Sequence, residues 1–254
     1  MITRVVVPVD AYNASLRALR PARVLADAAG AELVAATVVA KIGERGDVQA
    51  QLIRRITDSG TEVDSCVVEV NGYAVGQGLE SLCRGPEVLV VTTTPGHPHN
   101  RLWTGSVAEE LVHMRPEGAT VLVGPAVSID RFGLDGPMIG CIDPRRTSDE
   151  LLRMTGEFSQ EFGLEARFAT VIEPAMEPTA IDLVLEDVKL DVLHAGHPTK
   201  AIVELGDRLG ASMLSVGTRR RDALSRLAFG SVAIDLVVEA HQPVLAMHDY
   251  VAKH

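Results

Sequence analysis

The chain has 254 residues, a hydrophobic content of 46% and a net charge of −10. This acidic balance argues against general nucleic-acid binding, which needs clustered positive charge to neutralise phosphates. No apolar run is long enough for a membrane-spanning helix and the N-terminus lacks a signal peptide, so we expect a cytoplasmic protein with no membrane partner. Cys66, Cys83 and Cys141 show neither metal nor redox spacing, and we expect reduced thiols.

Short apolar runs alternate with segments of helical periodicity along the first half of the chain. The expected strands are residues 4–10, 31–39, 61–70, a run that ends at Val91, and 119–124. The expected helices are residues 15–29, 47–59, 74–83 and 105–114, with a loop over residues 92–104. Pro21 lies inside the first of these helices, so this helix is expected to begin late or to kink.

The second half repeats this alternation. Its expected strands are residues 137–143, 166–172, 192–195, 213–216 and 244–247. Its expected helices are residues 148–162, 199–209 with Thr199 as the cap, and 232–239, while residues 181–190 fit a helix only in part. Gly217 is expected to break the strand that precedes it. Strand–helix alternation of this kind predicts parallel sheets built from right-handed βαβ units.

An internal duplication divides the chain. The tetrapeptide Gly-Ser-Val-Ala occurs at Gly105 and again at Gly230, and the apolar run that ends at Asp10 matches the one that ends at Asp143. A repeat of this length predicts two copies of one domain, over residues 1–126 and 137–254, joined by a linker over residues 126–136. The second copy is the more acidic, with 13 basic and 20 acidic residues after residue 126, against 11 and 14 before it.

The loops before the two Gly-Ser pairs carry a family resemblance. Nucleotide-binding universal stress proteins have a glycine, two residues, a second glycine, nine residues and then Gly-Ser or Gly-Thr. In the second half, Gly217 and Gly230-Ser231 keep this spacing, and Arg220 replaces the second glycine. In the first half, Thr92 and Pro95 stand at the two glycine positions. Each half therefore resembles a universal stress protein domain, and the chain resembles a tandem member of that family.

This resemblance implies an α/β fold: two tandem copies of a five-stranded parallel-sheet domain that is Rossmann-like and similar to adenine nucleotide alpha hydrolases. The implied strand order is 3-2-1-4-5, which places the switch point between the strands that end at Asp10 and Val91. The last strands, Thr120 to Val123 and Val244 to Met247, are expected to pair as an intramolecular pseudo-dimer. A further homodimer of the chain is left open.

The resemblance also implies an adenine nucleotide ligand, ATP first, with Mg as an optional companion. In the second half, Asp143 would contact the nucleoside and Ser231 the phosphate. The nucleotide-binding residues expected there are Asp143, Val171, Ile172, Gly217, Arg220, Gly230, Ser231 and Val232. A weaker second site is expected at Asp10, Val39, Thr92, Gly105 and Ser106. The alternative is a purely structural role, since aspartate and serine at the ends of strands and the starts of helices also form turns and helix caps.

Arginines gather at the motif of the second half. Arg219, Arg220 and Arg221 are consecutive, and Arg145 and Arg146 follow the strand that ends at Asp143. They could clamp phosphate through bidentate hydrogen bonds, form a solvated basic patch, or place Arg220 in the pocket itself.

No catalytic residue is expected. The spacing shows no Ser-His-Asp set and no pair of catalytic carboxylates, so weak ATP hydrolysis is the most that we expect. His97 and His99 lack further ligands at metal-binding spacing and predict a polar loop. We therefore expect a regulatory protein that binds a nucleotide. The alternative is a scaffold without nucleotide whose partner is another protein, and a nucleotide-dependent transferase or adenylating enzyme ranks last.

Overall fold

The computed structural model describes residues 1–10, 13–72, 75–94, 107–114, 119–144, 149–174, 188–219 and 230–249. The chain forms two compact units. Unit 1 comprises Met1–Val123 and Ile129–Phe132, and unit 2 comprises Gly124–Ser128 and Gly133–His254. The finer domain boundaries at residues 126 and 137 stay a prediction.

Unit 1 has an α/β fold with a parallel sheet. Its strands are β1 Arg4–Pro8, β2 Glu32–Val39, β3 Ser65–Val70, β4 Val88–Thr93 and β5 Thr120–Val123. Its helices are α1 Asn13–Leu16, α2 Leu19–Ala29, α3 Arg45–Ser59, α4 Val75–Cys83 and α5 Val107–Met114, with 3-10 helices η1 Ile42–Glu44 and η2 Ile129–Arg131. The strand order is β3-β2-β1-β4-β5, with parallel pairing throughout, so the 3-2-1-4-5 order is confirmed.

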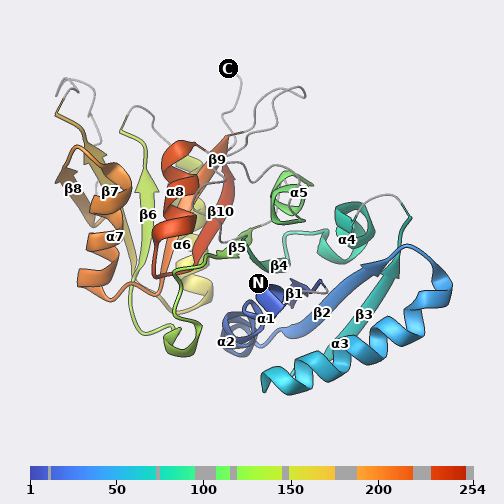
Figure 1. Ribbon diagram of the computed structural model, residues 1–254. Coiled ribbons are helices and arrows are strands. Elements are labelled where there is room, and N and C mark those ends of the chain that lie inside the picture. Colours follow the sequence, from blue (N-terminus) through green and yellow to red (C-terminus); the bar gives the residue numbers. More distant parts are fainter. Residues whose placement is uncertain are drawn as a thin grey trace. The chain divides into compact units, whose positions relative to one another are not determined.

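Helices cover both faces of this sheet (Figure 1). The helices α2 and α3 pack on one face, and α4 and α5 pack together on the other. The core under α4 and α5 consists of aliphatic residues and one cysteine from three strands and two helices: Val6, Val34, Ala36, Leu79, Cys83, Val88, Val90 and Leu111. Strands buried on both faces need the continuous apolar runs that the sequence shows.

The helix ends follow from local chemistry. A short turn separates α1 from α2, and Pro21 lies in the first turn of α2, where a missing amide costs nothing. This confirms the expected late start. The helices α2 and α3 end at Gly30 and Gly60, whose positive φ angles of 64° and 71° suit glycine.

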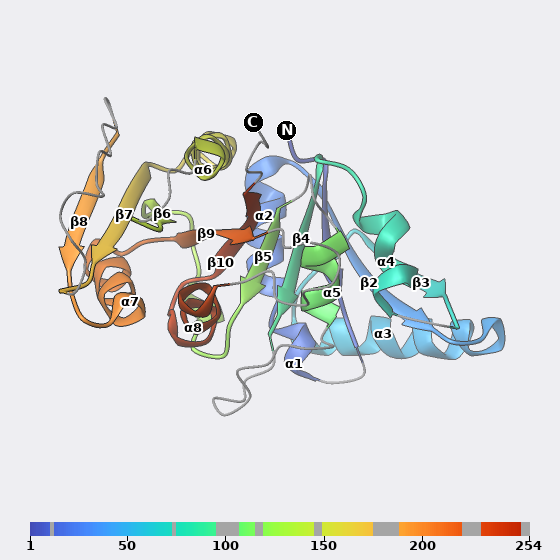
Figure 2. The ribbon, with the colours of Figure 1, turned by 90° about the horizontal axis from the view of Figure 1, so that it is seen from above.

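Unit 2 repeats the architecture. Its strands are β6 Met138–Ile142, β7 Ala166–Ile172, β8 Leu190–His194, β9 Met213–Arg219 and β10 Val244–Asp249. Its helices are α6 Asp149–Glu161, α7 Pro198–Leu209 and α8 Ser231–Glu239. The order β10-β9-β6-β7-β8, again with parallel pairing, is the same topology as in unit 1. Figure 2 shows α6 on one face of this sheet and α7 with α8 on the other.

In unit 2, one expectation about a helix start is wrong and one about a helical segment stays a prediction. Thr199 does not cap α7, because Pro198 is already helical and His197 is the N-cap residue. Proline suits the first helical position, since its fixed φ is already helical. Most of the expected segment 181–190 lies outside the described residues, although Leu190 itself begins β8.

The segment over residues 126–136, which the sequence predicted as a linker, makes specific hydrogen bonds. In unit 1, the Arg20 guanidinium donates to the Asp130 carboxylate at 3.0 Å and to its carbonyl oxygen at 3.1 Å. In unit 2, the Ser212 hydroxyl accepts from the amide of Gly136 at 2.9 Å and donates to its carbonyl at 3.0 Å. These contacts fix the segment at both places. No helix in the described ranges is long and apolar enough to cross a membrane.

Candidate functional site

The candidate site of unit 2 lies at the carboxyl ends of β6 and β9. These strands are neighbours, with Met138 paired to Met213 and Cys141 to Val216, and the chain order reverses between them. In open parallel sheets, ligands bind at this point because the connections leave in opposite directions and open a crevice.

Asp143 directly follows β6 and is half-buried. The carbonyl of Ile142 accepts a hydrogen bond from the buried Thr170 hydroxyl at 3.1 Å. This bond ties the end of β6 to β7 and helps to fix the backbone from which Asp143 extends. Sequence reasoning missed Thr170, because its role depends on a strand pairing.

The end of β7, the strand that pairs with β6, is apolar. Val171 is buried at 6% exposure and Ile172 is half-buried. The carbonyl of Ile172 accepts from the amide of Ala195 at 3.2 Å, so the backbone there is held by the segment that follows β8. Both residues lie where the resemblance places an adenine base.

Gly217 does not break β9. The strand continues through Gly217 to Arg219, and Gly217 pairs with Met247 of β10. The parallel ladder with β10 extends the strand past the glycine, a partner that local sequence does not reveal. Arg219 is therefore also a strand residue, whereas Arg220, Arg221, Arg145 and Arg146 lie outside the described residues.

The N-terminus of α8 lies at the same edge, because this helix follows β9. Gly230 is the N-cap residue, with an extended φ of −71° and ψ of 161°, and its carbonyl accepts from the amide of Ile234 at 3.1 Å. No side chain caps the helix start, and Ser231 is exposed as the first helical residue. Ser231 is thus not the cap that the alternative interpretation expected. The amides of Ser231, Val232 and Ala233 belong to the first turn, which has no intrahelical acceptors.

The corresponding edge of unit 1 is built differently. Val39 ends β2, is buried at 7% exposure, and its carbonyl accepts from the amide of Asn71 at 2.9 Å. Thr92 lies inside β4, opposite Leu122, so the expected loop begins later than Thr92. Asp10 is exposed beyond the end of β1. Gly105 and Ser106 lie outside the described residues.

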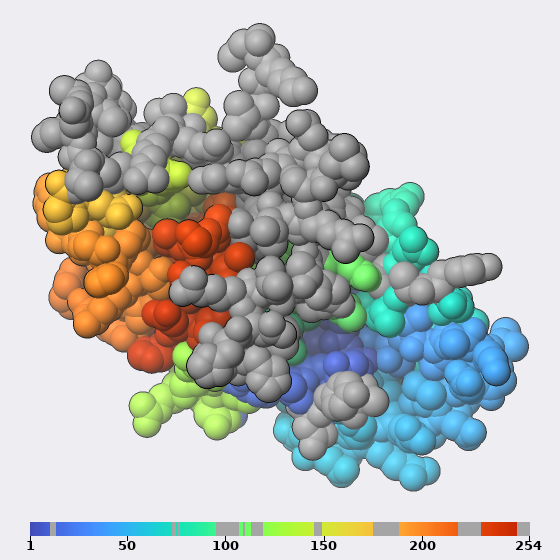
Figure 3. Space-filling view, turned by 45° about the horizontal axis from the view of Figure 1, so that its top comes forward, coloured from blue at the N-terminus to red at the C-terminus, as the bar shows by residue number. Residues whose placement is uncertain are grey.

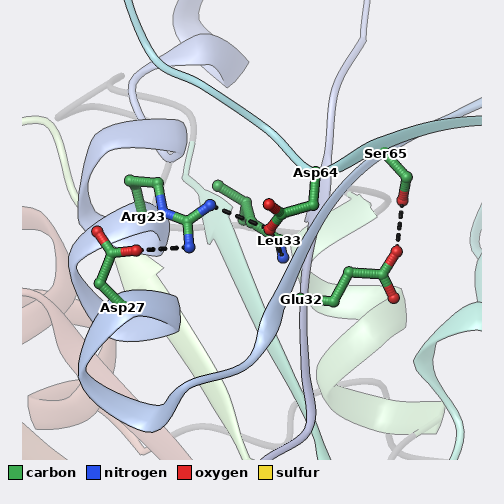
Figure 4. Close-up of polar contacts among 6 residues, drawn as sticks. All are labelled: Arg23, Asp27, Glu32, Leu33, Asp64 and Ser65. Carbon is green, nitrogen blue, oxygen red and sulfur yellow. Dashed lines mark hydrogen bonds and ion pairs between the residues drawn. The ribbon is translucent and has the colours of Figure 1, made fainter.

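A separate groove of about 800 Å³ runs beside α2 in unit 1. Its charged lining includes Arg20, Arg23, Asp27, Asp64 and Asp130. Arg23 contacts Asp27 at 2.6 Å and Asp64 at 3.0 Å (Figure 4), and Arg20 pairs with Asp130. These charges satisfy one another within unit 1, so we interpret the cluster as structural and assign it no ligand. Among the described residues, no three His, Cys, Asp or Glu side chains form a group that could hold a metal ion.

The fold and the edge between β6 and β9 define an α/β protein of the Rossmann-like class, with two five-stranded parallel units. Residues 186–248 match the family model described as Universal stress protein family. No curated protein matches the chain in sequence. Residues 186–248 thus resemble the universal stress protein family, which agrees with the resemblance seen in the sequence.

Solved structures show the same fold over the whole chain. A universal stress protein from Archaeoglobus fulgidus matches 98% of this chain and 97% of that chain, with 15% identity and a TM-score of 0.63. A functionally unknown protein from Pseudomonas aeruginosa PAO1 matches 98% of this chain and 93% of that chain, with 12% identity and a TM-score of 0.58. A universal stress protein solved in complex with cAMP matches 48% of this chain and 96% of that chain, with 24% identity and a TM-score of 0.38.

Proposed function

We propose that the chain is a regulatory binding protein that holds an adenine nucleotide, ATP first, at the carboxyl edge of unit 2. The uncapped start of α8 carries this proposal. This helix follows β9, and Asp143 follows the neighbouring parallel strand β6, so its first-turn amides and Asp143 belong to the same edge of the sheet. Free amides and the positive end of a helix dipole suit a phosphate group.

The space at the start of α8 is compatible with a ligand. Within the described part of the chain, a Cβ atom built on Gly230 meets no atom within 4 Å. In this proposal, the amides of Ser231 and Val232 bind phosphate, Asp143 binds the nucleoside, and Val171 and Ile172 flank the base. Gly217 and Arg220 stay predicted contacts. Mg²⁺ would accompany ATP as a counter-ion of its phosphates, and no catalytic residue is assigned.

A cytoplasmic location is part of the same proposal. Cys66, Cys83 and Cys141 are all free thiols, which is typical of a reducing compartment.

Calorimetric titration of the full chain with ATP, AMP and cAMP tests the proposal. We expect one ATP site per chain. Ser231→Pro should weaken it by about tenfold or more, because it removes one amide and one hydroxyl. Proline at this position keeps the helix, since it is favoured there and Gly230 already has the extended backbone that a following proline requires.

Three variants separate the contacts. Ser231→Ala removes the hydroxyl and keeps the amide, so a smaller loss than in Ser231→Pro identifies backbone binding. Asp143→Asn should weaken binding, whereas the matched change Asp10→Asn in unit 1 should not. Loss of binding in Arg220→Ala would support the arginine clamp.

The opposite result has a clear meaning. If folded protein gives no heat with any of the three nucleotides, the proposal is wrong. The replacement of the motif glycine by Arg220 would then favour the alternative, a scaffold that binds a protein partner without nucleotide.

A further inference from the structure

In unit 1, the backbone of Asp10 is already bound from two sides. Its amide donates to the hydroxyl of Ser15 at 3.2 Å, and its carbonyl accepts from the guanidinium of Arg55. Ser15 is buried at 5% exposure on α1, and Arg55 lies on α3. The turn that follows β1 is therefore held by two different helices.

The packing of α3 fixes the position of Arg55. Leu52 and Ile56, on either side of it, are buried at 3% and 4% exposure, and α3 packs against β3. Most other side chains of α3 form the exposed surface of unit 1 (light blue in Figure 3). Because β2 lies between β3 and β1, the Arg55 contact joins the helix over the edge strand to the end of the central strand.

The backbone amides at the end of β4 are not available to a ligand in the described residues. The amide of Thr94 donates to the carbonyl of Val123 at 3.3 Å, and Pro95 has no amide hydrogen. Along the described part of this edge, the backbone groups of Asp10 and Thr94 are thus used within unit 1.

In its sequence, the corresponding connection of unit 2 supplies no counterpart of Arg55. The connection from β7 to β8, residues 173–189, contains no arginine. Its one basic residue is Lys189, which pairs with Glu165 at 2.7 Å. The turn after β6 therefore cannot be held by an arginine from this connection.

We propose that Arg55 closes the carboxyl edge of unit 1 to nucleotides and so directs the ligand to unit 2. This inference rests on the proposed function. A nucleoside that approaches Asp10 must displace the guanidinium and leave the Asp10 carbonyl without its donor. The lost hydrogen bond weakens binding in unit 1 by roughly ten- to a hundredfold.

The number of ATP sites tests this assignment. We expect one site per chain in the wild type and two in Arg55→Ala. Arg54→Ala is the matched control, since Arg54 is an exposed neighbour on the same helix, and it should keep one site. Arg55→Lys keeps a cationic donor at this position, so we expect this variant to bind one ATP per chain, as the wild type does.

A second readout needs no nucleotide. Hydrogen exchange of the amides of residues 9–16 should become faster in Arg55→Ala and remain unchanged in Arg54→Ala, because only the first change frees the turn. Unchanged exchange in Arg55→Ala, with intact folding by thermal melting, would overturn the assignment of Arg55 as the residue that holds this turn.

The double variant Arg55→Ala/Ser231→Pro separates the two proposals. Ser231→Pro alone is the reference. One ATP site more in the double variant than in Ser231→Pro supports closure by Arg55, and equal numbers in these two variants would overturn it. If the wild type binds no ATP and Arg55→Ala binds one, closure is supported and the proposed function is wrong. Two sites in the wild type, or equal numbers in the wild type and Arg55→Ala, would overturn closure.

Discussion

The α-carbon of Gly124 lies directly against the main-chain carbonyl oxygen of Val237 in α8, and a Cβ atom on Gly124 would fall 1.8 Å from that oxygen. Gly124→Ala must therefore displace α8, and we expect it to lower the free energy of unfolding by about 2–4 kcal/mol. Gly156→Ala is the matched control, because a Cβ atom there meets nothing within 4 Å inside α6. It should stabilise unit 2 by about 0.5–1 kcal/mol. Urea unfolding measures both, and equal effects would contradict the contact.

The hydroxyls of Thr155 and Ser215 form a fully buried pair, 2.8 Å apart. Thr155→Val or Ser215→Ala alone leaves one hydroxyl without this partner, and each should destabilise the protein by about 1–3 kcal/mol. The double variant removes both hydroxyls and should cost less than the sum of the single changes. Chemical denaturation of the four proteins gives the coupling energy, and additive costs would show that the pair does not act as a unit.

The Asp64 carboxylate makes the stability of the folded protein depend on pH. Its carboxylate accepts from the amide of Leu33 at 2.7 Å and from Arg23 (Figure 4). These two bonds, the first being the larger cause, lower its pKa from the ordinary 3.8. A carboxyl whose pKa is lower in the folded state stabilises the fold above the unfolded pKa. This contribution is lost as the pH falls below 3.8 and through the folded pKa.

Asp64→Asn isolates that contribution. We expect the variant to be less stable than the wild type at pH 7, with the difference shrinking toward pH 2.5, as measured by denaturant unfolding at both pH values. Asp58→Asn on α3 is the control for the loss of a carboxylate, since Asp58 is exposed. A constant difference between Asp64→Asn and the wild type would contradict the linkage.

The thiols should differ in reactivity. Burial raises the pKa of Cys141 to about 12, and burial also raises the pKa of Cys66. Because the thiolate is the reactive form, both should react slowly with iodoacetamide at pH 8, and Cys66 should react before Cys141. Mass spectrometry of the labelled peptides measures the order, with urea-unfolded protein as the reference. Faster labelling of Cys141 than of Cys66 in the folded protein would contradict this order.

Many strands and helix ends could be predicted because short stretches of sequence determine them. The bounds of β7, residues 166–172, match the expected strand, since an apolar run between polar segments defines a buried strand. Gly30 and Gly60 end helices where the sequence predicted, because few other residues accept a left-handed backbone. The strand order came instead from the family resemblance.

The misses involve partners that are distant in sequence. Gly217 and Thr92 were expected in loops, yet β10 and β5 extend the strands that contain them. The contact between Arg55 and Asp10 spans 45 residues and leaves no local pattern. The pairing of residues 120–123 with residues 244–247 stays a prediction.

The central place of β1 has a consequence for synthesis. This strand is the first of its sheet to leave the ribosome, yet it needs β2 on one side and β4 on the other, and Arg4 pairs with Val88. Closing so long a loop makes parallel pairing slow, so nascent chains that end before Val88 expose one edge of β1. An unpaired edge of this kind can pair with another chain, so it is a place where aggregation during translation would begin.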